Sequence, residues 1–448
     1  MDNSNKYDVI VVGAGLAGLS CAYELSEKGK KVLVIEAQSY AGGRTSSFDD
    51  NGMQVESGLH RYIGYYSALP RLLKKCGVKI GDIVTWEEKV DILIKNKNKK
   101  LVLGLAPLFG PIKTVRGVLG NNDILTIQDK LSLIPFFVSG FSSYIFTDNL
   151  DNYTVAEYAN LHNVTEKGKR LILEPLSSGI FFMPPENYSA YAFFGLFAPA
   201  IGKFYKMRIG AFLGGMTDIM CNPIVDKIRS LGGEFVFGEA VEEVIIENDA
   251  VVGVKSKNGN EYFSNQTVIA TTLPSAKSIL ALLKKNINLR KLFELPTMSA
   301  CTLQLEMTKP ALEKDITTFG PGTDMVSFAE QSRTTFRNKN GRLSVILGNA
   351  KDYANKDAEE ILETVINEMD SLGVHLDKEN ILNYRKVAEK DEFYSLDKGN
   401  QKLRPTQNTG IQGLTLAGDY TLTPSFATME GAVISGELAA KECLKNSN

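Results

Sequence analysis

The stretch Val9-Ile-Val-Val-Gly13-Ala-Gly15-Leu-Ala-Gly18 decides the fold class of this chain. Its first part, Asp8–Val12, is a short apolar run rich in β-branched residues, which indicates a buried parallel strand. The glycines follow at once, and residues 19–28 then have the Ala, Leu and Glu content of a helix. A second apolar run, 31–35, completes a β-α-β unit. Together these features predict a dinucleotide-binding fold.

Each glycine in this turn has a physical reason to be there. Gly13 permits the tight turn after the strand, Gly15 lets the backbone approach a pyrophosphate, and Gly18 lets the helix pack closely on the strand. The free N–H groups and the dipole at the start of the helix favour a negatively charged ligand. We therefore expect a pyrophosphate to be cradled by the whole turn, that is by Gly13, Ala14, Gly15, Leu16, Ala17 and Gly18.

An acidic residue stands at the end of the second predicted strand. Glu36, followed by Ala37, lies where a carboxylate accepts hydrogen bonds from the hydroxyls of an adenosine ribose. The same carboxylate would repel a 2′-phosphate, so NADP is disfavoured at this site. The glycine turn lies between a strand and a helix, and a second strand and an acidic residue follow at the expected spacing. A chance glycine-rich turn is therefore a poor explanation of this sequence pattern.

Composition narrows the classes of function. The chain has 448 residues, of which 44% are hydrophobic and 23% charged, so it is expected to fold into two or three domains. Lys and Arg number 50 against 52 Asp and Glu, which gives a net charge of −2 and no basic field for nucleic acid. The five cysteines form no CxxC pair and the three histidines are scattered. Neither a metal site nor a disulfide framework is expected.

Targeting signals are not expected either. The polar N-terminus 1–8 resembles neither a signal peptide nor a transit peptide. The most apolar segment, 131–146, is interrupted by Pro135 and Gly140, so a transmembrane helix is not expected. These observations predict a cytoplasmic protein.

The remaining strand and helix signals divide the chain into two discontinuous domains. Residues 241–254 alternate and turn at Asn248-Asp249, and Asn258-Gly259 is a hairpin signal, which together predict a β-meander. A strand over 413–418 and a helix over 433–445 close the chain. We predict an α/β fold with a doubly wound, Rossmann-like nucleotide-binding domain that contains the meander, and an inserted α+β substrate domain. The first comprises 1–90, 210–285 and 400–448, and the second comprises 91–209 and 286–399.

Three further motifs carry a family resemblance. Gly42-Gly43-Arg44 follows the second strand, Glu56-Ser-Gly58-Leu-His60 precedes an aromatic stretch, and Gly418-Asp419 is followed by Met429-Glu-Gly-Ala432. In this order, the motifs resemble those of the FAD-dependent amine-oxidase superfamily. The closest resemblance is to the plant and cyanobacterial type of phytoene desaturase and ζ-carotene desaturase, and it extends over nearly the whole chain.

The resemblance implies that the cofactor is FAD and assigns contacts to it. Gly42, Gly43 and Arg44 would cover the phosphates and the ribityl chain, and Gly58 and Leu59 would approach the flavin ring. Val241 would bind adenine through its backbone. Gly418 and Asp419 would hold the ribityl–pyrophosphate region, and the backbone N–H of Met429 would face the flavin at a helix start.

The resemblance also implies an activity, desaturation of a long isoprenoid by hydride transfer to flavin N5, with a quinone or another acceptor taking the electrons. A hydrophobic substrate would suit a peripheral membrane protein.

Thr428 stands where amine oxidases of the superfamily usually have an aromatic residue, which argues against an amine as the substrate. Three alternatives stay open: a redox-neutral isomerase or dehydroxylase of a similar lipid, an amine or porphyrinogen oxidase, and a non-catalytic flavin-binding subunit.

Candidate residues for the substrate side are fewer. His60 is a candidate acid–base group, and Arg61 and Tyr62 stand where the desaturases continue with apolar residues. If the latter two face the flavin, a polar or anionic substrate group becomes more plausible. The aromatic and aliphatic segments 131–146 and 176–204 are expected to line an apolar tunnel or to meet a bilayer surface, with ordinary core helices as the alternative. No general base can be named from the sequence.

Overall fold

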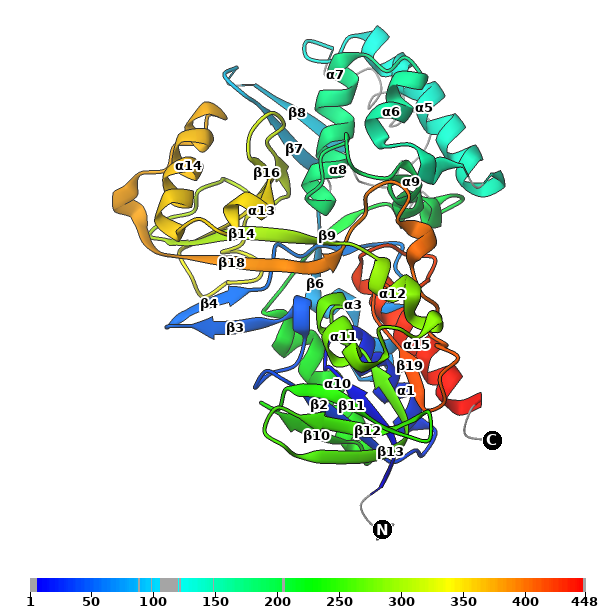
Figure 1. The fold of residues 1–448 in the computed structure, drawn as a ribbon. Helices are drawn as coiled ribbons and strands as arrows, with labels where there is room; N and C mark the ends of the chain where they lie inside the picture. The colour runs from blue at the N-terminus through cyan, green and yellow to red at the C-terminus, as the bar shows by residue number, and fades with distance from the viewer. Residues whose placement is uncertain are drawn as a thin grey trace.

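The computed structural model describes residues 6–445 apart from 88, 98, 105–119, 121, 148, 204 and 205. Two seven-stranded sheets organise the described chain, and a group of helices lies at one end of the second sheet (Figure 1). β1 and α15, the first and last elements of the described chain, both belong to the part of the molecule that contains the first sheet (Figure 1). This is the mixed α/β fold class expected from the sequence.

The first sheet is built mainly from parallel strands. Its order is β10 (Glu234–Phe237), β2 (Val32–Glu36), β1 (Tyr7–Val12) and β13 (Glu261–Ile269), with β19 (Leu414–Leu416) parallel to β13. β12 (Ala250–Ser256) and β11 (Val241–Glu247) extend it antiparallel and form the predicted meander. Asn248 and Asp249 both have positive φ, +48° and +63°, as a tight hairpin turn with the right-handed twist of its strands requires.

Helices from both ends of the chain pack on this sheet. α1 (Leu16–Glu27) packs against α15 (Met429–Lys445) and α10 (Asn222–Ser230). The contact with α15 is close because Gly436 has no side chain: a Cβ there would lie 2.2 Å from the carbonyl oxygen of Ala17. The nucleotide-binding elements predicted at the start, middle and end of the chain therefore meet in one unit.

The second sheet is mostly antiparallel. Its order is β18 (Ile381–Tyr394), β14 (Thr297–Met307), β17 (Gly341–Leu347), β16 (Met325–Glu330), β15 (Thr318–Phe319), β7 (Lys89–Ile94) and β8 (Lys99–Gly104). α14 (Ala358–Ser371) and α13 (Ala350–Tyr353) lie over its β14 and β18 end (Figure 1). The strands β14, β16 and β17 are almost wholly buried. The exact domain boundaries given above stay a prediction.

The helical group comprises α5 (Ile127–Phe146), α6 (Val155–Leu161), α7 (Glu166–Gly168), α8 (Glu174–Phe181) and α9 (Ala190–Phe197), all near β7 and β8 in Figure 1. Phe136 of α5 packs against Phe193 and Phe194 of α9 at ring distances of 5.9 and 5.1 Å. α5 contains Pro135, yet it is continuous over twenty residues. Among the described residues, no helix is both long and apolar enough to cross a membrane.

Short elements connect the two sheets. They are β3 (Ser47–Asp50) paired with β4 (Met53–Glu56), the small sheet of β5 (Tyr62–Ile63), β9 (Ile209–Phe212) and β6 (Val84–Glu87), and the helices α2 (Ala68–Lys75), α3 (Ile80–Ile83), α11 (Leu273–Ile279) and α12 (Arg290–Glu294). The loop between β4 and β5 carries the Gly58-Leu-His60 motif. These connections place that motif between the two large sheets.

Candidate functional site

A cavity of about 830 Å³ lies between the two large sheets. Its walls come from the carboxyl ends of β1 and β2, from β11, β14 and β18, and from the first residues of α15. The carboxyl ends of parallel strands are the usual place for ligands in such sheets. The cavity therefore joins the predicted nucleotide-binding elements to the second sheet.

The glycine turn leaves room for a ligand at the start of α1. Gly15 is the N-cap residue of this twelve-residue helix and has extended backbone angles. A Cβ at Gly15 would meet nothing nearer than the carbonyl oxygen of Gly42, at 4.0 Å, so the space above the helix is open. A Cβ at Gly18 would instead lie 1.9 Å from the carbonyl oxygen of Gly13. Gly15 leaves space for a ligand to approach the backbone, and Gly18 lets the helix pack closely on the turn, as the binding of a pyrophosphate requires.

Glu36 is held firmly at the end of β2. Its Oε2 accepts a hydrogen bond from the N–H of Ala14 at 2.7 Å, and its Oε1 accepts one from the N–H of Gln38 at 2.9 Å. A carboxylate has further lone pairs, so these two bonds fix its orientation and leave it able to accept from ribose hydroxyls. Glu36 and Ala37 both line the cavity.

Arg44 and Asp419 form an ion pair across the cavity wall. Arg44 Nη2 lies 2.6 Å from Asp419 Oδ1, and the guanidinium stacks 4.5 Å from the ring of Phe393. Burial opposes the charge of Arg44, but the attraction of Asp419 outweighs it and raises the pKa of Arg44. The cation is therefore permanent, and its remaining donors suit a phosphate.

The other predicted cofactor contacts surround the same space. Cavity-lining residues from the glycine turn and the later motifs are Gly13, Leu16, Ala17, Gly42, Gly43, Gly58, Leu59, Val241, Gly418 and Met429. Ala14 and Gly18 do not line the cavity: the first holds Glu36 through its N–H, and the second packs against the turn. Thr302 adds a buried hydroxyl on the cavity wall that has no hydrogen-bond partner within the described chain.

Comparison with known proteins agrees with this geometry. The family model described as flavin containing amine oxidoreductase matches residues 16–444. The chain belongs to this family of flavoproteins. Its cofactor is FAD, and the open glycine turn, the fixed Glu36 and the Arg44 cation fit that group.

Among curated relatives, the chain is 27% identical to the 15-cis-phytoene desaturase of Synechococcus elongatus over 460 residues, which cover 97% of this chain and 95% of that protein. It is 28% identical to the phytoene desaturase of Narcissus pseudonarcissus, covering 98% and 80% of the two chains. The zeta-carotene desaturase of Solanum lycopersicum is 25% identical, with 97% and 80% covered. The recognised resemblance is thus confirmed.

Solved structures share the fold of this flavoprotein at lower identity. A putrescine oxidase mutant aligns with a TM-score of 0.73 at 16% identity, covering 98% of this chain and 99% of the other. A putative protoporphyrinogen oxidase from Exiguobacterium aligns with a TM-score of 0.69 at 14% identity and 98% coverage of both chains. These likenesses establish the fold alone.

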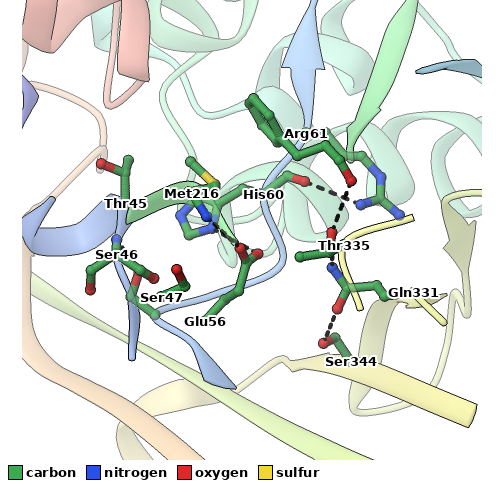
Figure 2. A network of polar contacts seen from close by, with 12 residues as sticks. Thr45, Ser46, Ser47, Glu56, His60, Arg61, Met216, Gln331, Thr335 and Ser344 are labelled. Atoms are coloured by element: carbon green, nitrogen blue, oxygen red, sulfur yellow. Dashed lines mark hydrogen bonds and ion pairs between the residues drawn. The ribbon is translucent and has the colours of Figure 1, made fainter. Parts of the chain in front are cut away.

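His60 lies on the wall of the flavoprotein's cavity, between Arg44 and Glu56. Its Nε2 is 2.9 Å from the carbonyl oxygen of Arg44, so that nitrogen carries the proton in the neutral ring. Its Nδ1 has no hydrogen-bond partner among the described residues and lies 3.9 Å from Oε2 of the buried Glu56 (Figure 2). The carboxylate of Glu56 accepts a hydrogen bond from the N–H of Met216 at 3.3 Å (Figure 2).

Arg61 also lines the cavity, but its charge is already paired. Arg61 Nε lies 2.8 Å from Glu87 Oε1 and donates to Thr317 Oγ1 at 2.9 Å. Its Nη1 donates to the carbonyl oxygen of His60 at 3.1 Å (Figure 2). Glu87 neutralises the guanidinium inside the protein, while Arg61 Nη2 has no hydrogen-bond partner among the described residues. A role of Arg61 toward the substrate stays a prediction.

Tyr62 does not belong to the cavity. Its ring packs against Tyr66, Trp86 and Phe212, with ring distances of 5.4, 5.7 and 6.3 Å. Strand alternation explains the difference, since Tyr62 starts β5 and points to the side opposite its neighbours in the cavity. The catalytic prediction for Tyr62 is therefore replaced by a packing role.

A second polar network lies near Arg61. Gln331 Nε2 donates to Thr335 at 3.2 Å, and the hydroxyl of Ser344 donates to Gln331 Oε1 (Figure 2). Thr335 in turn donates to the carbonyl oxygen of Phe212, at 3.2 Å. This network joins the second sheet to β9.

Among the polar residues on the cavity wall that sequence reasoning missed are Thr302 of β14, and Glu389 and Glu392 of β18. They lie far along the chain from every recognised motif. No signal in the sequence marks them, because their position depends on strand pairing and on a bulge in β18.

Proposed function

We propose that this FAD-dependent oxidoreductase dehydrogenates a long, apolar isoprenoid of the phytoene or ζ-carotene class and passes the electrons to a quinone or another acceptor. The observation that carries the proposal is the apolar wall of the cavity beyond the cofactor-binding motifs. That wall includes Ile180, Phe181, Phe182, Leu196, Met298, Phe319, Ile346 and Val387. The names of the curated relatives, phytoene and zeta-carotene desaturases, support the same substrate class.

A bound flavin supplies a two-electron acceptor for hydride. The residues of the chain would bind the cofactor and surround the substrate. The turn 13–18 and Arg44 bind the phosphates, Glu36 orients the ribose, and the aromatic and aliphatic wall excludes water from the hydrocarbon. Thr428 lines the cavity beside Met429 and leaves space where a large ring would narrow it. These features favour a long hydrocarbon over an amine.

A lipid surface is part of the proposal, because an isoprenoid of this length dissolves in membranes. The exposed side of α5 supports it: Val138 is 66% exposed and Phe146 is 80% exposed. Further exposed apolar residues on α5 are Ile127, Leu131, Ile134 and Ile145. Intervals of three, four and seven residues place Ile127, Leu131, Ile134, Val138 and Ile145 along one stripe of the helix, as in helices that lie on a membrane surface, and Phe146 follows at the end of the helix. We call this set the α5 stripe.

The test is anaerobic reduction of the bound flavin in a single turnover. FAD-loaded protein is mixed with phytoene or ζ-carotene in phosphatidylcholine vesicles, and with spermine as a parallel amine. We expect bleaching of the flavin absorbance by a carotene and a product with more conjugated double bonds. Bleaching by spermine alone would favour an amine oxidase instead. Product formation only with previously reduced flavin, and with no net electron transfer, would favour an isomerase or dehydroxylase.

A further inference from the structure

A β-bulge interrupts the edge strand β18 at the cavity. In the pairing with β14, Ala300 stands opposite Glu389 and Met298 stands opposite Phe393. Ser299 alone therefore faces the three residues 390–392. Asp391, in the middle, has a φ of +58°, a left-handed conformation that is uncommon for residues other than glycine. Its N–H donates to the hydroxyl of Ser299 at 3.1 Å, which holds the bulge.

The bulge changes which side chains reach the cavity. In a regular strand, residues 389 and 392 would lie on opposite faces of the sheet. Here Glu389 and Glu392 both line the cavity. Bulges re-aim side chains in this way and are over-represented next to active sites. The left-handed conformation of Asp391 thus brings two carboxylates, Glu389 and Glu392, to the cavity wall within electrostatic range of Arg44.

Several charged groups on the wall are held by partners within the chain, but Glu389 is not. Asp419 is paired with Arg44, Arg61 is paired with Glu87, and Glu36 accepts two backbone N–H groups. The backbone of Glu389 pairs with β14, but no hydrogen bond or ion pair links its side chain to any part of the chain that the structure describes. This carboxylate is half-buried, so burial disfavours its charge and its oxygens are free to accept a proton.

A second observation points into the same part of the cavity. Thr302 is only 3% exposed, and its Oγ1 has no partner in the described structure. Thr302 stands opposite Val387 in the sheet, two residues before Glu389. A buried hydroxyl and a carboxylate, both without partners, therefore lie on neighbouring positions of one cavity wall.

The charged surroundings allow Glu389 to change its protonation state. Burial raises the pKa of Glu389, the positive charge of Arg44 opposes this rise, and Glu392 adds to it; the ring of His60 also lies within electrostatic range. The phenol of Tyr40 also lies within electrostatic range. On β14, the residues opposite and next to Glu389, namely Ala300 and Met298, carry no charge. The net result is a carboxylate that binds a proton more readily than an exposed glutamate does.

We propose that Glu389, delivered to the cavity by the bulge in β18, is the proton acceptor of the reaction. This inference rests on the proposed function. Dehydrogenation removes two hydrogens from neighbouring carbons of the substrate. One leaves as hydride to the bound FAD, the other leaves as a proton to the carboxylate of Glu389, and the electron pair of the broken C–H bond forms the new double bond. Glu392 beside it favours the protonated product.

The first test measures the pH at which the carboxylate of Glu389 binds a proton, and it needs no substrate. FAD-loaded protein with ¹³C-labelled glutamate carboxyl groups is titrated by NMR, and Glu389 is assigned by the resonance that Glu389→Gln removes. We expect this resonance to titrate at higher pH than most glutamates, and to shift to lower pH in Glu392→Gln. Titration together with the exposed glutamates, unaffected by Glu392→Gln, would overturn the proposal.

The second test follows reduction of the flavin by phytoene in phosphatidylcholine vesicles. Glu389→Gln is expected to slow reduction by about 10²- to 10⁴-fold, the usual loss for a proton-transfer group, with FAD affinity unchanged. Glu389→Asp is expected to keep part of the rate. The wild-type rate should fall as the pH is lowered and Glu389 becomes protonated, and Glu389→Gln should lose this dependence.

Glu379→Gln is the matched control, since Glu379 is an exposed carboxylate just before β18. It is expected to behave as wild type. Wild-type rate and pH profile in Glu389→Gln would overturn the inference while leaving the proposed function intact. If no isoprenoid reduces the wild-type flavin, the proposed function itself fails and the inference with it.

Discussion

Arg44 Nη2 and Asp419 Oδ1 lie 2.6 Å apart, although 375 residues separate them in the chain. The pair closes the cavity between the loop after β2 and the loop after β19. Arg404 supports the second loop from behind, since its Nη2 donates to the carbonyl oxygens of Asp419 and Thr421. A cofactor that touches both loops is therefore bound by the two ends of the chain together.

Arg44→Met is expected to weaken FAD binding. It removes a cation that suits the phosphates and leaves Asp419 without its partner in a partly buried site. Loss of one member of such a pair costs about 2–3 kcal/mol, which corresponds to roughly a hundredfold higher Kd. The Kd is measured by quenching of FAD fluorescence during titration with FAD-free protein.

The double variant Arg44→Met/Asp419→Asn should recover part of this loss, because it no longer leaves a carboxylate unpaired. Arg290→Met is the control: Arg290 Nε and Glu294 Oε1 form an exposed pair at 3.5 Å, which contributes little. Unchanged FAD affinity in Arg44→Met would show that the cation does not contact the cofactor.

The buried pair of Arg61 and Glu87 leads to a prediction about stability. Glu87→Ala leaves the guanidinium of Arg61 buried without its counter-ion and is expected to lower the free energy of unfolding by about 3–5 kcal/mol. Arg61→Met/Glu87→Met replaces both charges by apolar groups and should be much less destabilised. Urea unfolding, followed by circular dichroism, measures both. A stable Glu87→Ala variant with impaired substrate binding would instead give Arg61 a role toward the substrate.

The nucleotide-binding half could be predicted from the sequence because its signals are local. The turn Gly13–Gly18, the acid at Glu36 and the Asn248-Asp249 hairpin each occupy a few consecutive residues. Each of them lies in the structure in the element expected for it. Backbone conformation and spacing alone determine these features, so one sequence suffices to find them.

Features that depend on contacts between distant segments could not be predicted in the same way. The neutralisation of Arg61, in the loop before β5, depends on Glu87 at the end of β6. The position of Glu389 depends on a bulge that shifts the register of β18 against β14. Tyr62 is a candidate site residue in the sequence because it stands where the desaturases have apolar residues, but strand alternation turns its ring into the core. Non-local pairing decides all three cases.

A pH-dependent contribution to stability is expected from Asp129 in the capping box of α5. Asp129 Oδ2 accepts from the N–H and the hydroxyl of Thr126, each at 2.8 Å, and Oδ1 accepts from Thr165 Oγ1 at 2.8 Å. Burial opposes the charge, but these hydrogen bonds outweigh it and lower the pKa of Asp129. The stabilisation is therefore present above the unfolded-state pKa, about 3.9, and is lost as the pH falls through the lower folded-state value.

Asp129→Asn should cost about 1 kcal/mol at pH 7, as other helix caps do, and the difference from wild type should shrink toward pH 3. Urea unfolding at both pH values measures it. Asp357→Asn is a suitable control, because Asp357 precedes α14 without a side-chain capping bond. A difference between Asp129→Asn and wild type that is independent of pH would contradict the assignment.

The α5 stripe provides a test of the proposed lipid surface that does not depend on catalysis. Leu131→Asp and Val138→Asp each place a charge where an apolar side chain would enter the acyl region, and each is expected to weaken binding to phosphatidylcholine vesicles by roughly tenfold or more. Co-sedimentation with vesicles measures the binding. Leu282→Asp changes a residue that is equally exposed, at 65%, but lies outside α5. We expect it to bind vesicles as wild type does, with FAD content unchanged in all three variants. If the two α5 variants bind as tightly as Leu282→Asp, the stripe does not contact lipid and the isoprenoid must reach the cavity by another route.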